Sequence, residues 1–491
     1  MTGRVVIVGY GMAGSRLASE LRARDGDRKI VVLGAEPHRA YNRIMLSNLL
    51  AGKIDETQVE LTEAAGHGVD IRPGVAVTAV DPAAATVTTD RQDIIEYDHL
   101  VLATGSRALV PPLPGLVPDR QTTPDPERLP RRVVAFRTLD DCRRIVDAAT
   151  GARTALVLGG GLLGLEAARG LAARGLDVRV VHPVGHLMER QLDPAAGAVL
   201  ARTLAGLGVT SHLDTSATAV DAEPDRVTLT LATGDRLTAD LLVLACGVRP
   251  ETGLARAAGL VVERGIVVDD RLRTSDPRIW AIGDCAQHEG QLTGLVAPAW
   301  AQARVLAQVL TGDDPQARYR PQAPVTRLKA AGIDLAAMGD LTPTDAAQPA
   351  VEELSFTDPA RGTYARLRIV HERLTGAIML GDNPAVGTVI QLFDRGTPVP
   401  SDRRSLLLGR ALGGQSATPV ESPALMPDAA TVCQCNTVPK GALVRCWRAG
   451  ARSVAEVVAA TRATTGCGSC RDAVEGIVNW LSTVDSAEVT G

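Results

Sequence analysis

The chain has 491 residues, a length at which one hydrophobic core gives way to several, so we expect three or four domains. The formal net charge is −4, with 45% hydrophobic and 22% charged residues, which is typical of a soluble globular protein. No long basic or acidic run favours nucleic acid or an anionic membrane as a partner. No apolar stretch reaches the roughly 18 residues of a membrane span. No signal peptide precedes the first strand pattern, so we expect a cytoplasmic protein.

Short β-branched runs alternate along the chain with helical stretches rich in alanine, leucine and arginine. The runs Val5–Val8 and Ile30–Leu33 form one such pair, and Leu156–Leu158 and Val178–Val181 form another. This alternation predicts βαβ units around parallel sheets. Because the pattern occurs twice, we expect an α/β fold with two Rossmann-like dinucleotide-binding domains.

A glycine-rich turn follows the first strand and opens a helix. Gly9 permits the tight turn, Gly11 lets the backbone approach a pyrophosphate, and Gly14 allows the helix to pack closely on the strand. Glu36, after the second strand, can accept hydrogen bonds from a ribose diol. A plain glycine-rich turn is the alternative, but this context favours a dinucleotide site. Its expected contacts are Gly9, Gly11, Met12, Ala13, Gly14 and Glu36.

A second glycine-rich turn follows the strand Ala155–Leu158 and repeats this geometry. Its expected contacts are Gly159, Gly161, Leu162, Leu163, Gly164, Glu166 and His182. The alternative is a degenerate repeat that binds no nucleotide. An acidic residue after the strand Val178–Val181 would favour NADH, but His182-Pro183 stands there, and Arg190 can meet a 2′-phosphate. The residues therefore leave both NADH and NADPH open.

Five of the eight cysteines lie in the last sixty or so residues. Cys433-Gln434-Cys435 is followed by 31 residues and then by Cys467-Gly468-Ser469-Cys470. Four thiolates suit a [2Fe-2S] cluster, and structural zinc is the alternative. The fifth, Cys446, lies in a helical pattern and is expected to pack in the core. The scattered cysteines, at 142, 246 and 285, are expected to be small buried hydrophobic residues.

Several motifs resemble those of flavoproteins with two dinucleotide sites. Leu100–Gly105 resembles their strand ending in an Ala-Thr-Gly turn, and Thr274–Asp284 resembles their second FAD fingerprint. Asn42–Ser47 resembles the loop that covers FAD. The resemblance implies FAD at the first site and NAD(P)H at the second. No CxxC follows either glycine-rich turn, so we expect no redox-active disulfide next to the flavin. It adds as FAD contacts Arg43, Ser47, Ala103, Thr104, Gly105 and Asp284. For Asp284, the alternative is a structural role in a turn or at a helix cap.

The cysteine-rich tail resembles the BFD-like [2Fe-2S] domain, with Cys433, Cys435, Cys467 and Cys470 as the expected ligands. The whole order of motifs resembles electron-transfer subunits of assimilatory nitrate reductases and the N-terminal part of NAD(P)H nitrite reductase large subunits. The shared strings are Ala40–Arg43, Phe136–Asp141, Met188–Asp193 and Gly332–Asp334. Those large subunits continue into a sirohaem domain. This sequence stops at Gly491, so we expect its electrons to leave for another protein.

The expected domains are an FAD-binding domain (1–120 and 251–318), an NAD(P)H-binding domain (121–250), a small α+β domain (319–410), a linker (411–428) and a helical [2Fe-2S] domain (429–491). In the small domain, Thr326–Gly339, Tyr364–Val370 and Ala377–Leu380 are expected to be strands.

The resemblance implies a path from NADH, with NADPH possible, through FAD and the cluster to a molybdenum-containing nitrate reductase catalytic subunit. One alternative is a reductase for a separate nitrite reductase or another acceptor. A second is an FAD-dependent amine or opine dehydrogenase-type subunit, although such subunits have no full nicotinamide domain. A third is a zinc- or redox-dependent interaction protein that uses the tail as a binding module.

Overall fold

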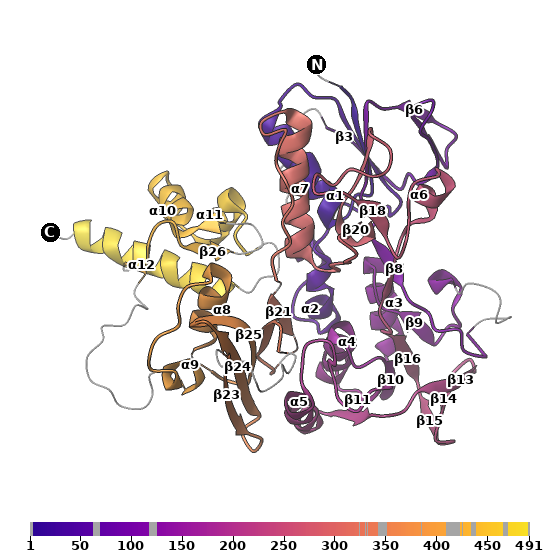
Figure 1. The fold of residues 1–491 in the computed structure, drawn as a ribbon. Helices are drawn as coiled ribbons and strands as arrows, with labels where there is room; N and C mark the ends of the chain where they lie inside the picture. Colours follow the sequence, from indigo (N-terminus) through magenta and orange to yellow (C-terminus); the bar gives the residue numbers. More distant parts are fainter. Residues whose placement is uncertain are drawn as a thin grey trace.

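The computed structural model describes residues 3–61, 69–116, 125–323, 325–328, 330, 332–341, 351–383, 385–408, 423–424, 426–433, 438–464 and 470–489. Two five-stranded parallel sheets of one design form the larger part of the molecule (Figure 1). The first has the order β19-β7-β1-β2-β3, with bounds Ile279–Ala281, His99–Leu102, Val5–Val8, Ile30–Gly34 and Val69–Pro73. The second has the order β12-β11-β10-β16-β9, with bounds Val209–His212, Asp177–Val181, Thr154–Leu158, Leu241–Leu244 and Val133–Ala135.

The second sheet is inserted into the first, because β19 returns to pair with β7 after the second sheet is complete. In the first sheet the chain builds outward from β1 through β2 to β3 and then crosses to β7, on the other side of β1. In the second sheet it starts at the edge strand β9, builds outward from β10 through β11 to β12, and then crosses to β16, between β10 and β9. Ligands of such sheets bind at this switch point, beyond the carboxyl ends of the strands. The two segments that link the sheets pair with each other as the antiparallel strands β8 (Ser106–Ala108) and β17 (Val248–Pro250).

Helices, two short antiparallel sheets (β4-β5-β6 and β13-β14-β15) and the short parallel pair β18-β20 cover these two units. The helices are α1 (Met12–Arg24), α2 (Leu46–Leu50), α3 (Leu139–Ala149), α4 (Leu162–Ala173), α5 (Pro194–Gly206), α6 (Gly253–Ala257) and α7 (Val296–Thr311). The further strands are β4 (Val77–Asp81), β5 (Thr86–Thr89), β6 (Ile94–Glu96), β13 (Ala217–Ala222), β14 (Val227–Leu231), β15 (Arg236–Ala239), β18 (Ile266–Val268) and β20 (Ala286–His288).

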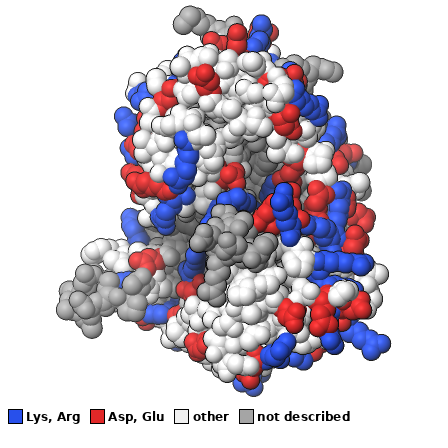
Figure 2. Space-filling view, turned by 90° about the vertical axis from the view of Figure 1, so that its right-hand side faces the viewer, with Lys and Arg blue, Asp and Glu red and all other residues white. Residues whose placement is uncertain are grey.

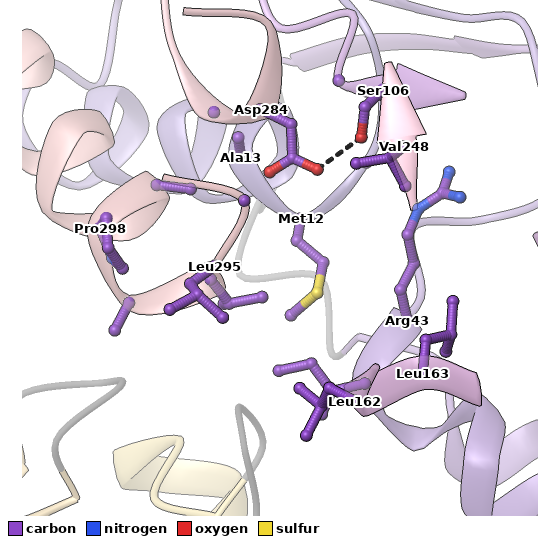
Figure 3. A pocket seen from close by; sticks show the side chains of 18 of the residues that line it. Met12, Ala13, Arg43, Ser106, Leu162, Leu163, Val248, Asp284, Leu295 and Pro298 are labelled. Carbon is purple, nitrogen blue, oxygen red and sulfur yellow. Dashed lines mark hydrogen bonds between the residues drawn. The ribbon is translucent and has the colours of Figure 1, made fainter. Parts of the chain in front are cut away.

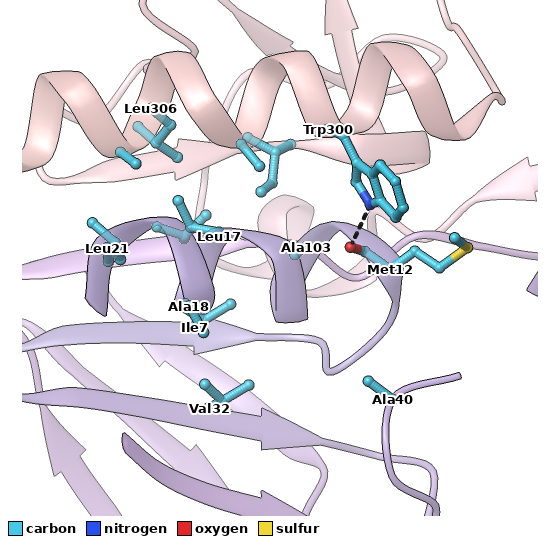
Figure 4. Close-up of a cluster of buried hydrophobic side chains, with 14 of the residues drawn as sticks. Ile7, Met12, Leu17, Ala18, Leu21, Val32, Ala40, Ala103, Trp300 and Leu306 are labelled. Atoms are coloured by element: carbon cyan, nitrogen blue, oxygen red, sulfur yellow. Dashed lines mark hydrogen bonds between the residues drawn. The ribbon is translucent and has the colours of Figure 1, made fainter. Parts of the chain in front are cut away.

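Helices α1 and α7 pack against each other over the first sheet, although nearly three hundred residues separate them (Figure 4). Leu17, Leu21 and Leu306 are fully buried between the helices and the sheet. Each such side chain stabilises the packing by about 1.5–3 kcal/mol. Trp300 is also fully buried, and its indole N–H donates to the Met12 carbonyl oxygen at 2.9 Å. This contact holds the start of α7 beside the first glycine-rich turn.

The small α+β domain has one antiparallel sheet of order β21-β22-β25-β24-β23. Its strands are β21 (Val325–Leu328), β22 (Leu335–Gly339), β23 (Val351–Asp358), β24 (Thr363–Val370) and β25 (Arg373–Leu380), with helices α8 (Val386–Arg395) and α9 (Arg404–Leu408). The predicted strand Thr326–Gly339 is wrong as one element, because the chain turns between β21 and β22. Strand β23 was not predicted, because its side chains are mostly exposed or half-buried and give no apolar run.

The C-terminal domain pairs β26 (Thr431–Cys433) with β27 (Val438–Pro439) and contains α10 (Lys440–Arg448), α11 (Val454–Thr461) and α12 (Arg471–Val489). The Trp447 indole donates to Asp485 Oδ2 at 2.7 Å and joins α10 to α12. Buried residues of this domain belong to the same hydrophobic cluster as Leu17 and Trp300 of the first unit. The domain therefore packs against the first unit, as Figure 1 shows beside α7. Most of the predicted linker 411–428 lies outside the described residues.

Acidic and basic side chains are interspersed over the face shown in Figure 2. In the part of the chain that the structure describes, no helix is both long and apolar enough to cross a bilayer.

Asp193 joins the second unit to the small domain. Its carboxylate caps α5 by accepting the Ala196 N–H at 2.8 Å. It also accepts from the Tyr364 hydroxyl at 2.7 Å and from Arg366 Nη1 at 3.0 Å. These hydrogen bonds outweigh the effect of burial, which opposes ionisation, and lower the pKa of Asp193. The stabilisation they give is therefore present above the ordinary carboxyl pKa and is lost as the pH falls through the lowered value.

We expect Asp193→Asn, which keeps the helix cap but removes the charge, to lower the free energy of unfolding by about 1–3 kcal/mol. Asp193→Ala also loses the cap and costs about 1 kcal/mol more. Urea unfolding at pH 7 measures both variants. Midpoints equal to that of the unsubstituted protein would show that Asp193 does not hold the two units together.

Candidate functional site

A cavity of about 1990 Å³ lies where the two parallel sheets face each other. Its walls include the turns that follow β1 and β7 in the first unit and those that follow β10 and β16 in the second. Typical ligand pockets reach only about 1,000 Å³, so this cavity has room for more than one large ligand. Both switch points open into it.

The first glycine-rich turn has the geometry of a phosphate-binding loop. Gly9 has a φ of 115°, and a Cβ there would stand 2.1 Å from the Ala103 carbonyl oxygen. A Cβ on Gly14 would stand 1.9 Å from the Gly9 carbonyl oxygen, so α1 packs on β1 only with glycine at that position. Around Gly11, no neighbouring atom of the described residues lies within 4 Å of a Cβ position. This open cradle, at the start of a helix without a side-chain cap, fits a pyrophosphate.

The second turn repeats this geometry closely. Gly159 has a φ of 117°, and a Cβ there would stand 2.3 Å from the Ala245 carbonyl oxygen. A Cβ on Gly164 would stand 1.9 Å from the Gly159 carbonyl oxygen, the same distance as between Gly14 and Gly9 in the first turn. Gly161 likewise has an open cradle among the described residues and begins α4 without a side-chain cap. The residues present thus fit two dinucleotides, one at each turn.

Most of the predicted contacts line this one cavity. Those that do are Gly9, Gly11, Met12, Ala13, Glu36, Arg43, Ala103, Thr104, Gly105, Asp284, Gly159, Gly161, Leu162, Leu163, Glu166 and His182. Gly14 and Gly164 lie behind the turns, where they allow the helices to pack. Ser47 is buried and does not line the cavity, and its hydroxyl donates to the Ile44 carbonyl oxygen at 3.3 Å.

Asp284 lies at the carboxyl end of β19, in the short 3-10 helix Gly283–Cys285. Its Oδ2 accepts from the Ser106 hydroxyl at 2.7 Å (Figure 3). It also accepts from Arg137 Nη2 at 2.6 Å. In the same view, Met12 extends into the space between Asp284 and Leu162. Arg137 follows β9 of the second unit, so this ion pair joins the two units across the cavity.

Glu36, after β2, is also held in place at the cavity wall. The Tyr41 hydroxyl donates to its Oε2 at 2.7 Å, and Arg43 forms an ion pair with its other oxygen. Burial raises the pKa of Tyr41 well above its usual range, so the hydroxyl keeps its proton and remains a donor. The carboxylate is therefore held at the cavity wall, where a ribose diol can donate to it.

Three further groups line the cavity and were not among the predicted contacts. Ala245–Gly247 follows β16 as Ala103–Gly105 follows β7, and the apolar run Leu241–Leu244 before it was the available signal. Arg137 lies in the shared string Phe136–Asp141, which did not by itself indicate a contact with the cavity. The start of α7, from Leu295 to Ala299, presents a helix N-terminus without a side-chain cap. Its free N–H groups and positive dipole end favour negative charge on a ligand.

The scattered cysteines do not provide a reactive thiolate. Cys142 and Cys285 are fully buried, and burial raises the pKa of both thiols. Cys246 is only half-buried and lines the cavity, contrary to the prediction for it. Burial nevertheless raises its pKa to about 11, and its thiol donates to the Leu158 carbonyl oxygen at 3.4 Å. At neutral pH these three residues are protonated, and thiolates are the reactive form.

The C-terminal domain contributes to the same cavity through Thr431, Val432, Cys470 and Ala473. Cys433 and Cys470 are buried, whereas the other two predicted ligands, Cys435 and Cys467, lie outside the described residues. Cys446 is half-buried in α10 and packs against the hydrophobic cluster, as predicted. The domain that carries the predicted cluster ligands therefore borders the space that both glycine-rich turns face.

Comparison with known families agrees with this geometry. Residues 3–303 match the pyridine nucleotide-disulphide oxidoreductase family. Residues 324–396 match the rubredoxin NAD⁺ reductase C-terminal domain, and residues 431–480 match the BFD-like [2Fe-2S] binding domain. In the crystal structure of the covalent putidaredoxin reductase–putidaredoxin complex, a similar chain has 26% identity and a TM-score of 0.71, over 83% of this chain and 95% of that one.

Two relatives from Bacillus subtilis (strain 168) match nearly the whole chain. The assimilatory nitrate reductase electron transfer subunit is 34% identical over 98% of this chain and 60% of its own length. The nitrite reductase [NAD(P)H] is 35% identical over 97% of this chain and 57% of its own length. The chain thus spans less than two thirds of either relative.

These matches assign FAD and NAD(P)H to the two Rossmann-like units and a [2Fe-2S] cluster to the C-terminal domain. They favour the cluster over structural zinc as the group held by the tail. The fold, the paired glycine-rich turns and the match over residues 3–303 establish that the chain belongs to the pyridine nucleotide-disulphide oxidoreductase family.

Proposed function

We propose that this chain takes electrons from NADH or NADPH and delivers them, through FAD and its [2Fe-2S] cluster, to a separate molybdenum-containing nitrate reductase catalytic subunit. The observation that carries the proposal is the shared cavity, which is lined by both glycine-rich turns and by Cys470 of the C-terminal domain. The partner is suggested by the nitrate reductase electron transfer subunit, which is similar along nearly the whole chain.

When bound, FAD accepts electrons in pairs from a nicotinamide and releases them singly to a one-electron carrier. The chain's own residues supply position and electrostatics. Gly11 and Gly161 leave room for the two pyrophosphates. Glu36 and Asp284, each fixed by an arginine, are positioned to accept hydrogen bonds from the hydroxyl groups of FAD. The start of α7 offers free N–H groups, and the apolar side chains of Met12, Leu162 and Leu295 limit water in the cavity.

We also propose that the cofactors bind at the site residues, and that the chain divides into the domains, that the sequence predicts. The FAD domain covers 1–120 and 251–318, the NAD(P)H domain 121–250, the α+β domain 319–410 and the cluster domain 429–491. The four cluster ligands are Cys433, Cys435, Cys467 and Cys470.

A reductase for a separate nitrite reductase is the second candidate, because the nitrite reductase relative is as similar as the nitrate reductase subunit. An amine or opine dehydrogenase is disfavoured by the intact second glycine-rich turn, which such an enzyme does not need. The two remaining candidates share their chemistry and differ only in the electron acceptor.

Reconstitution with each catalytic subunit distinguishes these candidates. We expect NADH-dependent nitrate reduction when the chain is mixed with a molybdenum nitrate reductase subunit, and no nitrite reduction with a separate sirohaem subunit. The assay measures nitrite formation and nitrite loss. Nitrite loss without nitrite formation from nitrate would favour the second candidate. The absence of both activities would refute both candidates.

We expect Asp284→Asn to reduce FAD affinity by about tenfold, since it removes a charged acceptor held by Ser106 and Arg137. Flavin absorbance per chain after gel filtration, and titration of the deflavinated protein with FAD, measure this loss. The control is Asp221→Asn, an exposed carboxylate of the β13–β14 hairpin. Unchanged flavin retention in the Asp284 variant would remove Asp284 from the site.

We expect Cys470→Ser to lose iron and acid-labile sulfide while it keeps FAD and its reduction by NADH. The ligand prediction places Cys470 in the cluster, whereas the flavin residues lie on other elements. Cys446→Ser is the matched control, because this half-buried cysteine of α10 is not a predicted ligand. Iron and sulfide analysis of both variants gives the readout. Full iron and sulfide content in the Cys470 variant would contradict the ligand assignment.

A further inference from the structure

The second dinucleotide site lacks the usual acidic residue at the end of its second strand. In Rossmann-like domains this residue accepts hydrogen bonds from the adenine-side ribose of NAD. Here β11 ends at Val181, and His182 occupies the next position with only 5% of its surface exposed. An imidazole in this position cannot replace the carboxylate that distinguishes a ribose hydroxyl from a 2′-phosphate.

The hydrogen bonds of His182 show what the imidazole does instead. The Gly160 backbone N–H donates to His182 Nδ1 at 3.1 Å. Because a backbone amide can only donate, Nδ1 is an acceptor and the ring proton is on Nε2. Nε2 lies 3.1 Å from Glu189 Oε2, so it donates to that carboxylate. His182 thus connects the glycine-rich turn to Glu189.

The backbone around Glu189 is fixed to the same turn. Leu187 and Met188 are fully buried, and the Met188 N–H donates to the Gly160 carbonyl oxygen at 3.0 Å. Met188 has a φ of 53°, and its own carbonyl oxygen accepts the N–H of Leu192 at 2.9 Å. The segment therefore forms a tight turn, and Glu189 projects from it into the cavity wall with about a third of its side chain exposed.

Gly160 shows that this arrangement is built into the sequence. A Cβ at this position would stand 2.7 Å from Leu187 Cδ2 and 2.8 Å from His182 Cγ. The first turn carries Tyr10 at the corresponding place, between Gly9 and Gly11. Gly160, the middle one of the three consecutive glycines of the second turn, thus gives the room that His182 and Leu187 occupy.

We propose that Glu189, oriented by His182, is the carboxylate that binds the adenine-side ribose hydroxyls and selects NADH over NADPH. This inference rests on the proposed function and names its electron donor. A fixed carboxylate accepts hydrogen bonds from a diol and repels the 2′-phosphate of NADPH. Arg190 also lines the cavity, and its positive charge would favour the 2′-phosphate of NADPH. None of the described hydrogen bonds or ion pairs, however, fixes its guanidinium. Glu189 is a binding residue in this account, and His182 is a positioning residue.

The test compares the dissociation constants of NAD⁺ and NADP⁺, by isothermal titration calorimetry, with kcat and KM for NADH and NADPH. We expect the unsubstituted protein to bind NAD⁺ more tightly. Glu189→Gln is expected to shift the ratio of the two constants toward NADP⁺ by about tenfold, through KM and with little change in kcat. The matched control is Glu223→Gln, an exposed carboxylate paired with Arg226 outside the cavity.

His182 is tested by two substitutions. His182→Phe keeps a ring but removes both hydrogen bonds, so the ratio is expected to shift in the same direction as in Glu189→Gln. His182→Gln keeps an N–H donor toward Glu189 and is expected to restore part of the preference. An unchanged ratio in Glu189→Gln, or tighter binding of NADP⁺ by the unsubstituted protein, would overturn the inference alone. Binding of neither dinucleotide would overturn the proposed function as well.

Discussion

The structure depends on one steric constraint, the close approach of a glycine-rich turn to the turn after the neighbouring strand. At Gly9 and Gly159 a side chain would meet a carbonyl oxygen at 2.1 Å and 2.3 Å, so only glycine lets the two strand ends stand side by side. This closeness puts the N-terminus of α1 or α4 at the switch point of its sheet. Because the constraint occurs twice, two amide-lined cradles face one cavity.

The way the chain is assembled brings three redox sites to that cavity. The second sheet is inserted between β7 and β19 of the first, so Arg137 of one unit reaches Asp284 of the other. Trp300 then holds α7 on the first glycine-rich turn, and α7 adds its N-terminus to the wall. The C-terminal domain shares a hydrophobic cluster with this unit and places Cys470 at the same space. The three parts of the chain that would hold these groups therefore border one cavity.

Local patterns predicted the parts of the site that depend on a strand, a turn and a helix in succession. Both glycine-rich turns, the Ala103–Gly105 turn and Asp284 lie where the sequence indicated. Contacts between distant residues were missed, since Arg137 and Ser106 lie 147 and 178 residues from Asp284. Arg137 belongs to the shared string Phe136–Asp141, but that string does not indicate which residue Arg137 contacts. Ser47 was assigned to the cavity by resemblance and is buried behind it. Strand β23 was not predicted because few of its side chains are buried, so its sequence has no apolar pattern typical of a strand.

The central claim is that electrons from a nicotinamide reach both the flavin and the cluster of one chain. An anaerobic titration with NADH, followed through flavin and cluster absorbance, tests it most directly. Two electrons for FAD and one for a [2Fe-2S] cluster require about 1.5 equivalents of NADH for full reduction. The account predicts that both absorbances fall within this range. A flavin that bleaches with about one equivalent while the cluster stays oxidised, or a flavin that does not bleach at all, would contradict it.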